Sequence, residues 1–270
     1  MECRYCFLAA RAKAASSPVV FTDLARMAEN VRNWLRLVST PALLNCGELS
    51  DSLLYDKASN HSRTLFPLFE GPENPMGHGI LYVTKATNVA HLIALANELR
   101  ERSGRDRLSH LVLSWSLSFR DAARDYESGA PTSAERIRAA KVCQDAGYRV
   151  RLRLAPLIAT RGWQNGYDQL VRQVEGEGLV PERWTLGSLR LLPGMQVALA
   201  KSRHSLESIE WTADPERRAA IPRDLRVHTY RVLQGLITRR FPDAEIGICK
   251  ETELVRELVG VTGFACNCQL

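Results

Sequence analysis

Residues 80–117, ILYVTKATNVAHLIALANELRERSGRDRLSHLVLSWSL, contain the pattern that decides the fold class of this chain. An apolar run at Ile80–Val83 predicts one buried strand, and a second run at Leu111–Leu117 predicts another. Between the two runs, leucines recur at helical spacing and predict a helix over Asn88–Glu101. A strand, a helix and a strand in this order are typical of parallel α/β structure with right-handed crossovers.

The same alternation continues toward both ends of the chain. Further strands are predicted at Ala42–Cys46, Val150–Ile158, Trp184–Leu192 and Glu245–Cys249. Further helices are predicted at Thr22–Val38, from a Thr132-x-x-Glu135 capping box to Ala146, at Gly166–Val174, Leu225–Phe241 and Glu251–Val259. The stretches Pro67–Gly79 and 202–222 are expected to be irregular. We therefore expect a barrel-like α/β core over residues 1–201, followed over 202–270 by a linker and a small helix–strand–helix appendage.

Composition limits the classes of protein that need considering. The 270 residues, 45% of them hydrophobic, can fill one large α/β core. Neither an apolar run of membrane-spanning length nor the order of a signal peptide is present, so a cytoplasmic protein without membrane contact is expected. Seven cysteines, an odd number scattered along the chain, argue for a reducing compartment. The net charge of +6 permits a polyanionic partner, although basic clusters are also common at helix ends.

Cys3 and Cys6 form a C-x2-C pair that could bind one metal ion or cluster from a tight loop. Two cysteines cannot hold a cubane iron–sulfur cluster alone, and a third ligand four residues before Cys3 would precede Met1. The strand that should precede the first helix is missing from the same place, so we expect an upstream segment to be absent from this sequence. The alternative is a stray pair in an irregular terminus. The tail offers a second possible ligand pair, Cys266 and Cys268, with a flexible terminus as the alternative.

Several predicted strands end in polar residues, which is where parallel barrels place their active sites. Ser50 follows the strand that begins near Leu43, Lys85 follows the next strand, and Ser116 ends the third. Each residue alone could simply cap a turn or lie in solvent. Together with the cysteine loop, they predict one shared site.

Three arginines alternate with apolar residues at Arg149, Arg151 and Arg153, which places them on one face of a strand. They could line a wide barrel mouth or lie on an exposed face. The exposed alternative is favoured, because burying three unpaired guanidinium groups is costly. A glycine-rich phosphate loop and a nucleophile elbow are both absent from the sequence, which argues against conventional kinases and hydrolases.

The sequence Cys3-Arg-Tyr-Cys-Phe-Leu resembles the end of the C-x3-C-x2-C loop of radical S-adenosylmethionine enzymes. The chain as a whole is similar to the spore photoproduct lyase family, at Gly47-Glu-Leu-Ser-Asp-Ser-Leu, Tyr82-Val-Thr-Lys85, Tyr126-Glu127-x-Gly129, Ala155-Pro156-Leu-Ile and Gly162-Trp163-x-x-Gly166-Tyr167. The resemblance implies a partial (β/α)6 barrel, here lacking its first strand, with a [4Fe-4S] cluster and S-adenosylmethionine as cofactors. It also implies a 5′-deoxyadenosyl radical, repair of a thymine photoproduct in DNA, a reductant such as flavodoxin or ferredoxin, and a monomer.

The resemblance also implies roles for individual residues. Cys3 and Cys6 match cluster ligands, and Tyr5 matches a tyrosine of the hydrogen-transfer relay. The residues that match contacts to S-adenosylmethionine are Ser50, Lys85 and Ser116.

Two positions depart from the family pattern. Glu48 stands where the repair enzymes carry a hydrogen-donating cysteine, and Phe7 replaces a second relay tyrosine. Cys46, two residues before Glu48, is then the candidate catalytic thiol, as a donor or a replacement ligand. The departures leave two alternatives to the repair enzyme: a radical S-adenosylmethionine relative with a different substrate, and a truncated, cluster-free remnant that binds nucleic acid or is inactive.

Overall fold

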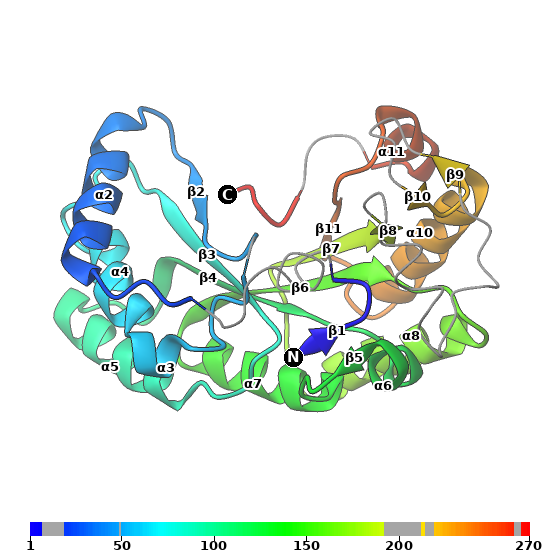
Figure 1. The fold of residues 1–270 in the computed structure, drawn as a ribbon, viewed down its shortest axis with the longest axis horizontal. Coiled ribbons are helices and arrows are strands. Elements are labelled where there is room, and N and C mark those ends of the chain that lie inside the picture. The colour runs from blue at the N-terminus through cyan, green and yellow to red at the C-terminus, as the bar shows by residue number, and fades with distance from the viewer. Residues whose placement is uncertain (7–18, 49, 192–211, 214–218, 262–265) are drawn as a thin grey trace.

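The computed structural model describes residues 1–6, 19–48, 50–191, 212–213, 219–261 and 266–270. Its centre is a six-stranded sheet with the strand order β11-β7-β6-β4-β3-β2. All neighbouring strands in this sheet are parallel. The strands are β2 (Leu43–Asn45), β3 (Gly79–Thr84), β4 (Leu108–Ser116), β6 (Tyr148–Leu157), β7 (Arg183–Ser188) and β11 (Glu245–Ile248). The sheet curls into a half-barrel, with β2 at one edge and β11 at the other (Figure 1).

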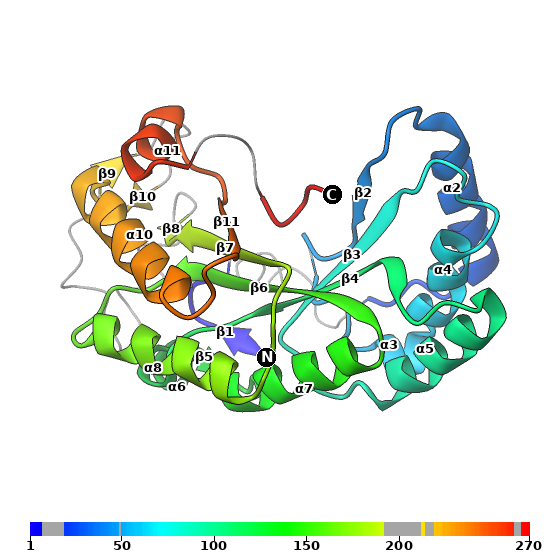
Figure 2. The same cartoon turned by 180° about the vertical axis from the view of Figure 1, so that it is seen from behind.

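The described helices cover the convex face of the sheet (Figures 1 and 2). They are α2 (Leu24–Leu37), α3 (Asp56–Ser59), α4 (His61–Glu70), α5 (Ala90–Ser103), α6 (Arg120–Tyr126), α7 (Ser133–Asp145), α8 (Trp163–Gly176), α10 (Arg223–Thr238) and α11 (Glu253–Val259). Within the described part of the chain, each helix is too short or too polar to cross a membrane.

The two faces of the sheet differ in chemistry because side chains alternate along each strand. On β4, Leu111, Leu113 and Trp115 are buried and belong to the hydrophobic core under the helices. The alternate residues of β4, including Ser114 and Ser116, point toward the concave face. The core therefore lies on the convex side, and the polar residues of the strands line the inside of the half-barrel.

Two small sheets complete the described structure. β1 (Glu2–Cys3) pairs antiparallel with β5 (Glu127–Ser128). A three-stranded sheet has the order β8-β10-β9, with β8 (Arg190–Leu191), β9 (Thr212–Ala213) and β10 (Ala219–Ala220).

The predicted parallel α/β alternation is confirmed, with three differences. Pro67–Gly79 is irregular only in its second half, because α4 continues through Pro67 to Glu70. Burial of apolar side chains, among them Phe66 and Phe69, outweighs the hydrogen bond that a proline inside a helix removes. The strand predicted over Trp184–Leu192 divides in two, because β8 leaves the main sheet to pair with β10. Most of the stretch 202–222 lies outside the described residues.

The third difference concerns the three arginines of β6, for which the exposed alternative is wrong. Arg151 is fully buried, and Arg149 and Arg153 are half-buried. Burial is possible because the guanidinium groups have partners: Glu182 accepts hydrogen bonds from both Arg149 and Arg151. The arginines therefore line the inside of the half-barrel.

Candidate active site

The Cys3–Cys6 turn lies against the segment that follows β4. Pairing of β1 with β5 places Cys3 opposite Glu127, and the Arg4 amide donates to the Tyr126 carbonyl over 2.9 Å. The Cys6 amide donates to the Cys3 carbonyl over 3.0 Å and closes the turn. Both thiols are half-buried. Backbone contacts thus help to hold the cysteine pair beside Glu127.

Glu127 is the centre of the site. Its Oε1 accepts hydrogen bonds from the Tyr5 hydroxyl and from Ser118 Oγ, the latter over 2.7 Å. The Lys85 ammonium lies 3.7 Å from the same oxygen and 5.6 Å from the centre of the Tyr5 ring. Oε2 accepts a hydrogen bond of 2.5 Å from Arg136, whose guanidinium is fully buried. One buried carboxylate thus joins the N-terminal turn, the end of β3 and helix α7.

The charges in this cluster fix the protonation states. Burial by itself would raise the pKa of Glu127, but Lys85, Arg136 and the hydrogen bonds from Tyr5 and Ser118 outweigh it and lower that pKa. Burial, followed by the charge of Glu127, raises the pKa of Tyr5 well above its ordinary value. At neutral pH, Glu127 is therefore a carboxylate and Tyr5 a neutral phenol that donates to it.

Burial also raises the pKa of the Cys3 thiol, an effect that the positive charge of Lys85 opposes. The thiolate is the form of cysteine that binds metals. The positive charge of Lys85 would therefore help the Cys3 thiol to lose its proton when it binds a metal ion.

The loop after β2 is tied to the end of β3. Asp51 Oδ2 accepts the Lys85 amide over 2.7 Å, and Oδ1 accepts the Thr84 hydroxyl over 2.7 Å. Ser50, the preceding residue, is exposed. Ser116 is buried at the end of β4, and its carbonyl accepts a hydrogen bond of 2.9 Å from the same Arg136 guanidinium that binds Glu127. Ser50, Lys85 and Ser116 thus follow or end three adjacent strands, β2, β3 and β4, at their carboxyl ends.

Cys46 and Glu48 are placed differently from these residues. Cys46 continues the alternation of β2, so its side chain lies with Leu44 against the hydrophobic core. Burial raises the pKa of Cys46 to about 12, which keeps it as a neutral thiol. Glu48 is exposed and forms an ion pair of 2.9 Å with Lys250, which follows β11. The ion pair of Glu48, the residue that departs from the family pattern, therefore links the two opposite edges of the half-barrel.

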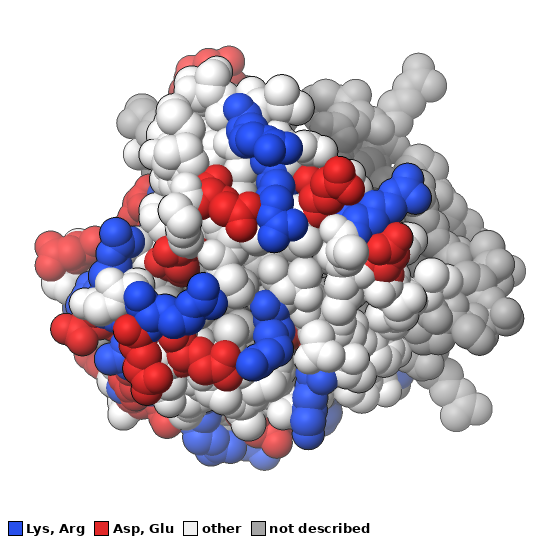
Figure 3. All heavy atoms as spheres, turned by 90° about the vertical axis from the view of Figure 1, so that its left-hand side faces the viewer, with Lys and Arg blue, Asp and Glu red and all other residues white. Residues whose placement is uncertain are grey.

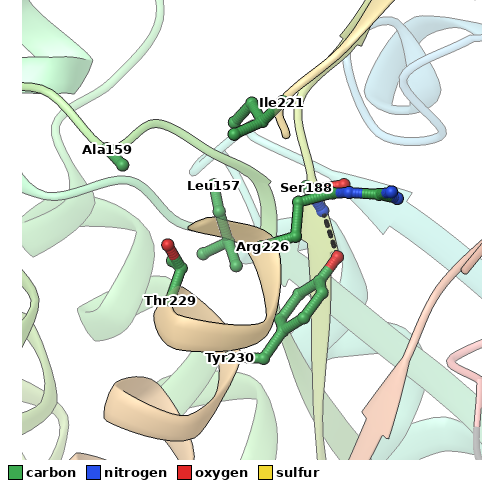
Figure 4. Close-up of a pocket in the computed structure, with 7 residues that line it drawn as sticks. All are labelled: Leu157, Ala159, Ser188, Ile221, Arg226, Thr229 and Tyr230. Carbon is green, nitrogen blue, oxygen red and sulfur yellow. Dashed lines mark hydrogen bonds between the residues drawn. The ribbon is translucent and has the colours of Figure 1, made fainter. Parts of the chain in front are cut away.

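A second buried carboxylate, which sequence reasoning did not identify, lies after β11. Glu251 accepts hydrogen bonds from Arg226 (2.6 Å), Tyr230 (2.8 Å) and Ser188 (2.9 Å) and forms a 2.6 Å ion pair with Arg190. Figure 4 shows the small cavity of about 10 Å³ beside this network, with Tyr230 accepting the Ser188 amide. A space of this size holds at most one water molecule, so we interpret the network as structural.

Sequence reasoning also gave no role to Arg136 and Ser118, and quoted Glu127 only as part of a motif. The one available signal for Arg136 was an arginine in the first turn of a predicted helix, where a cation is disfavoured by the helix dipole. Its burial and its ion pair with Glu127 explain why it is there.

One exposed basic cluster of the described residues lies away from this site. Arg102 lies in the last turn of α5, and Arg105 and Arg107 lie between α5 and β4, at the amino ends of the strands and thus at the opposite end of the sheet. On the face that carries α2 and α4, basic and acidic side chains are interspersed (Figure 3). Ion pairs such as Arg63–Glu98 belong to this face. Arg217 and Arg218 lie outside the described residues.

The described residues supply an incomplete set of ligands for a cubane cluster. Such a cluster takes three or four cysteines, and the turn offers Cys3 and Cys6. Among the described residues, no group of three His, Cys, Asp or Glu side chains is arranged to hold a metal ion. We therefore derive no reaction step through a cluster.

Comparison with known proteins identifies the family. The family model for spore photoproduct lyase matches residues 2–185. A solved spore photoproduct lyase double mutant, with bound AdoMet and dinucleoside spore photoproduct, has a TM-score of 0.75 and 17% identity to this chain. A spore photoproduct lyase complexed with dinucleoside spore photoproduct has a TM-score of 0.73 and 18% identity. Both alignments cover 91% of this chain and 72% of the other.

None of the curated proteins matches the chain. The structural likenesses, at such low identity, show a shared fold. The family model, which spans more than half of the sequence, shows more: this chain belongs to the spore photoproduct lyase family of radical S-adenosylmethionine enzymes.

Proposed function

We propose that this chain binds S-adenosylmethionine at the carboxyl ends of β2, β3 and β4 and acts on a thymine photoproduct in DNA. The observation that carries the proposal is the junction at Glu127, which joins the Cys3–Cys6 turn to Lys85. In this arrangement the thiols and the cation of the expected cofactor site share one edge of the sheet. The bound AdoMet and dinucleoside spore photoproduct of a solved relative support this assignment.

Each residue of the site would have a separate role in binding the cofactors. Lys85 would bind the carboxylate of S-adenosylmethionine, since an ammonium and a carboxylate form a charge-assisted hydrogen bond. Glu127 would orient Lys85 and Tyr5 while remaining ionised. Ser50 and Ser116 would offer hydroxyl groups on either side of Lys85. Cys3 and Cys6 would be two of the ligands of a [4Fe-4S] cluster, which needs at least one further cysteine.

Tyr5 would be the group that exchanges a hydrogen atom. Its hydroxyl proton is already hydrogen-bonded to Glu127 Oε1, so the carboxylate can hold that proton whenever the phenol is oxidised. Cys46 would serve as a thiol donor only if its side chain turned out of the core, because it packs there with Leu44.

A second candidate function is supported by Glu48. A carboxylate that is paired with Lys250 cannot return a hydrogen atom as a thiol does. The alternative to photoproduct repair is therefore that this chain uses the same radical S-adenosylmethionine chemistry on a different substrate.

The test is an anaerobic incubation of the protein with iron, sulfide, S-adenosylmethionine, a chemical reductant and DNA that contains the thymine photoproduct. Loss of the adduct together with formation of 5′-deoxyadenosine supports the proposed repair reaction. Formation of 5′-deoxyadenosine without loss of the adduct supports the second candidate. Protein that binds no iron and forms neither product contradicts both, and favours a cluster-free protein.

A matched pair of variants tests the S-adenosylmethionine site. Lys85→Ala should weaken binding of S-adenosylmethionine in equilibrium dialysis by at least tenfold. Lys57→Ala removes an exposed lysine of α3 and should leave binding unchanged. Equal binding by the two variants would contradict the placement of the site.

A further inference from the structure

The C-terminal segment Cys266–Leu270 lies inside the half-barrel, between β2 and β11 (Figure 1). Arg183 donates to the carbonyl of Cys266 over 2.9 Å, and Arg151 donates to the carbonyl of Asn267 over 2.8 Å. The Asn267 side chain is fully buried and donates to Ser114 Oγ over 3.0 Å. The segment is therefore held in one position by the polar lining of the concave face.

This position brings three thiols together. Cys266 Sγ lies 3.6 Å from the Sγ of Cys249 and 2.8 Å from the Sγ of Cys268. Cys249 is the first residue after β11, and its amide donates to the Leu186 carbonyl over 2.7 Å, so it is fixed on the edge of the sheet. Cys266 is thus the central sulfur, in contact with one thiol of the sheet and one of its own segment.

The surroundings favour a reactive sulfur at Cys266. Its sulfur contacts both of the other thiols, and the positive charge of Arg153 acts on all three cysteines. A central sulfur in contact with two further thiols, near an arginine and within reach of solvent, is suited to thiol–disulfide exchange. Cys268 is exposed, which leaves the trio accessible to a small reagent.

We infer that Cys249, Cys266 and Cys268 form a thiol–disulfide exchange site, in which a Cys249–Cys266 disulfide fastens the C-terminal segment to the sheet. The oxidant would be a low-molecular-weight disulfide. The Cys266 thiolate attacks this disulfide, breaks its S–S bond and releases one thiol. Cys249 then attacks the mixed disulfide at Cys266 and releases the second thiol. Two protein thiols are oxidised by two electrons, and one small disulfide is reduced to two thiols.

Cys268 gives the site a way to open again. As a thiolate it can attack the Cys266 sulfur, which moves the disulfide to Cys266–Cys268 and returns Cys249 as a thiol. This exchange consumes no oxidant or reductant. The inference is independent of the S-adenosylmethionine site, because none of its three cysteines belongs to that site.

The test is exposure of the protein to oxidised glutathione, followed by alkylation and mapping of disulfides by mass spectrometry. Wild type should lose one pair of alkylatable thiols, and the disulfide found should always contain Cys266. Cys268→Ser should keep the Cys249–Cys266 bond, whereas Cys249→Ser should show only Cys266–Cys268. Cys266→Ser should lose no thiol pair. The control Cys143→Ala, which removes a cysteine buried in the core, should behave as wild type.

A second readout separates the fastening bond from incidental oxidation. Oxidation should raise the Tm of wild type and of Cys268→Ser, because only the Cys249–Cys266 bond ties the segment to the sheet. It should leave the Tm of Cys249→Ser and Cys266→Ser unchanged. A thiol pair lost from Cys266→Ser, a set of thiols unchanged by the oxidant, or stoichiometric zinc lost on mutation of these cysteines would overturn the inference.

Discussion

At the scale of the residue, Glu127 explains why an N-terminal turn of six residues can be part of a folded site. The carboxylate is buried with two cations and two hydroxyl groups around it, and each of these four comes from a different part of the chain. The resemblance of the sequence to the family was enough to propose Cys3 and Lys85 as site residues. It could not supply Glu127 as their link, because a glutamate in the segment before the Thr132 capping box is indistinguishable from a surface residue until its partners are known.

Substitution of Glu127 by glutamine should destabilise the protein by about 3–5 kcal/mol, because it leaves the buried charges of Lys85 and Arg136 without their counter-charge. The measurement is the free energy of unfolding in urea at neutral pH. Glu98→Gln, which removes an exposed ion pair with Arg63, is the control and should cost less than about 1 kcal/mol. Similar costs for the two variants would show that Glu127 is not a buried, charged link.

The pH dependence of stability follows from the lowered pKa of Glu127. A carboxylate whose pKa is lower in the folded state stabilises the protein above its ordinary pKa of about 4.3 and loses that effect as the pH falls further. The difference in stability between wild type and Glu127→Gln should therefore be largest above about pH 5 and shrink below about pH 4. A difference that stays constant between pH 7 and pH 3 would contradict the assignment of charge.

Replacing Tyr5 with phenylalanine should separate structure from hydrogen transfer. The variant loses one hydrogen bond to a charged acceptor, worth about 1.5–3 kcal/mol, while the ring remains against Lys85. Under the proposed function, S-adenosylmethionine should bind as before and adduct repair should fall at least tenfold. Tyr55→Phe, at an exposed position of the chain, is the control. Repair at the wild-type rate by Tyr5→Phe would exclude Tyr5 from the transfer.

At the scale of the element, the sequence predicted most of the sheet because each strand is a short apolar run followed by an amphipathic helix. The capping box at Thr132 and Glu135 is confirmed, since both of its reciprocal hydrogen bonds are present at the start of α7. Prediction failed where tertiary contacts override local signals. In α4 a proline argued for a loop, yet burial of the flanking aromatic rings keeps the helix intact.

The motif Gly162-Trp163-x-x-Gly166-Tyr167 acquires a physical explanation in α8. A Cβ atom at Gly166 would lie 2.4 Å from Cδ2 of Phe119, whose ring packs edge-on against Tyr167 at 5.0 Å between centroids. Glycine is thus required at this position because α8 passes directly over Phe119. The contact fixes α8 relative to the segment that leads from β4 into α6.

Gly166→Ala should therefore destabilise the protein by about 1–3 kcal/mol through overpacking against Phe119. Gly176, at the other end of the same helix, has open space around its Cβ direction, so Gly176→Ala is the matched control. The control should be neutral or stabilising by up to about 1 kcal/mol, because alanine is the better helix former. The measurement is the urea midpoint of both variants at constant m, and equal midpoints would show that α8 can move away from Phe119.

At the scale of the whole molecule, the contacts that could not be predicted are those between distant parts of the chain. Strand β1 pairs with β5, and the ion pair between Glu48 and Lys250 joins the ends of the two edge strands. The concave face is polar, but it is occupied by the C-terminal segment. The alternation along β6 predicts that its three arginines share one face of the strand. It does not predict what covers that face, and their exposure was therefore predicted wrongly.

The C-terminal segment should accordingly contribute to the stability of the entire half-barrel. Asn267→Ala removes a fully buried amide and leaves Ser114 Oγ without its donor, which should cost about 1–3 kcal/mol. Gln269→Ala is the matched control two residues away. Its exposed side chain accepts the Cys266 amide over 3.2 Å, whereas Arg151 and Arg183 bind its backbone carbonyl, which the substitution keeps, so the cost should be smaller than that of Asn267→Ala.

Unfolding in urea would measure the effect of each substitution on global stability, and hydrogen exchange of the amides in residues 266–270 would measure how firmly the segment is held. If the segment is an integral part of the fold, Asn267→Ala lowers the unfolding free energy and speeds exchange in these residues, and Gln269→Ala has the smaller effect on both. If both variants match wild type, the arginines of β6 and β7 must be satisfied without the segment, and the concave face is open in solution.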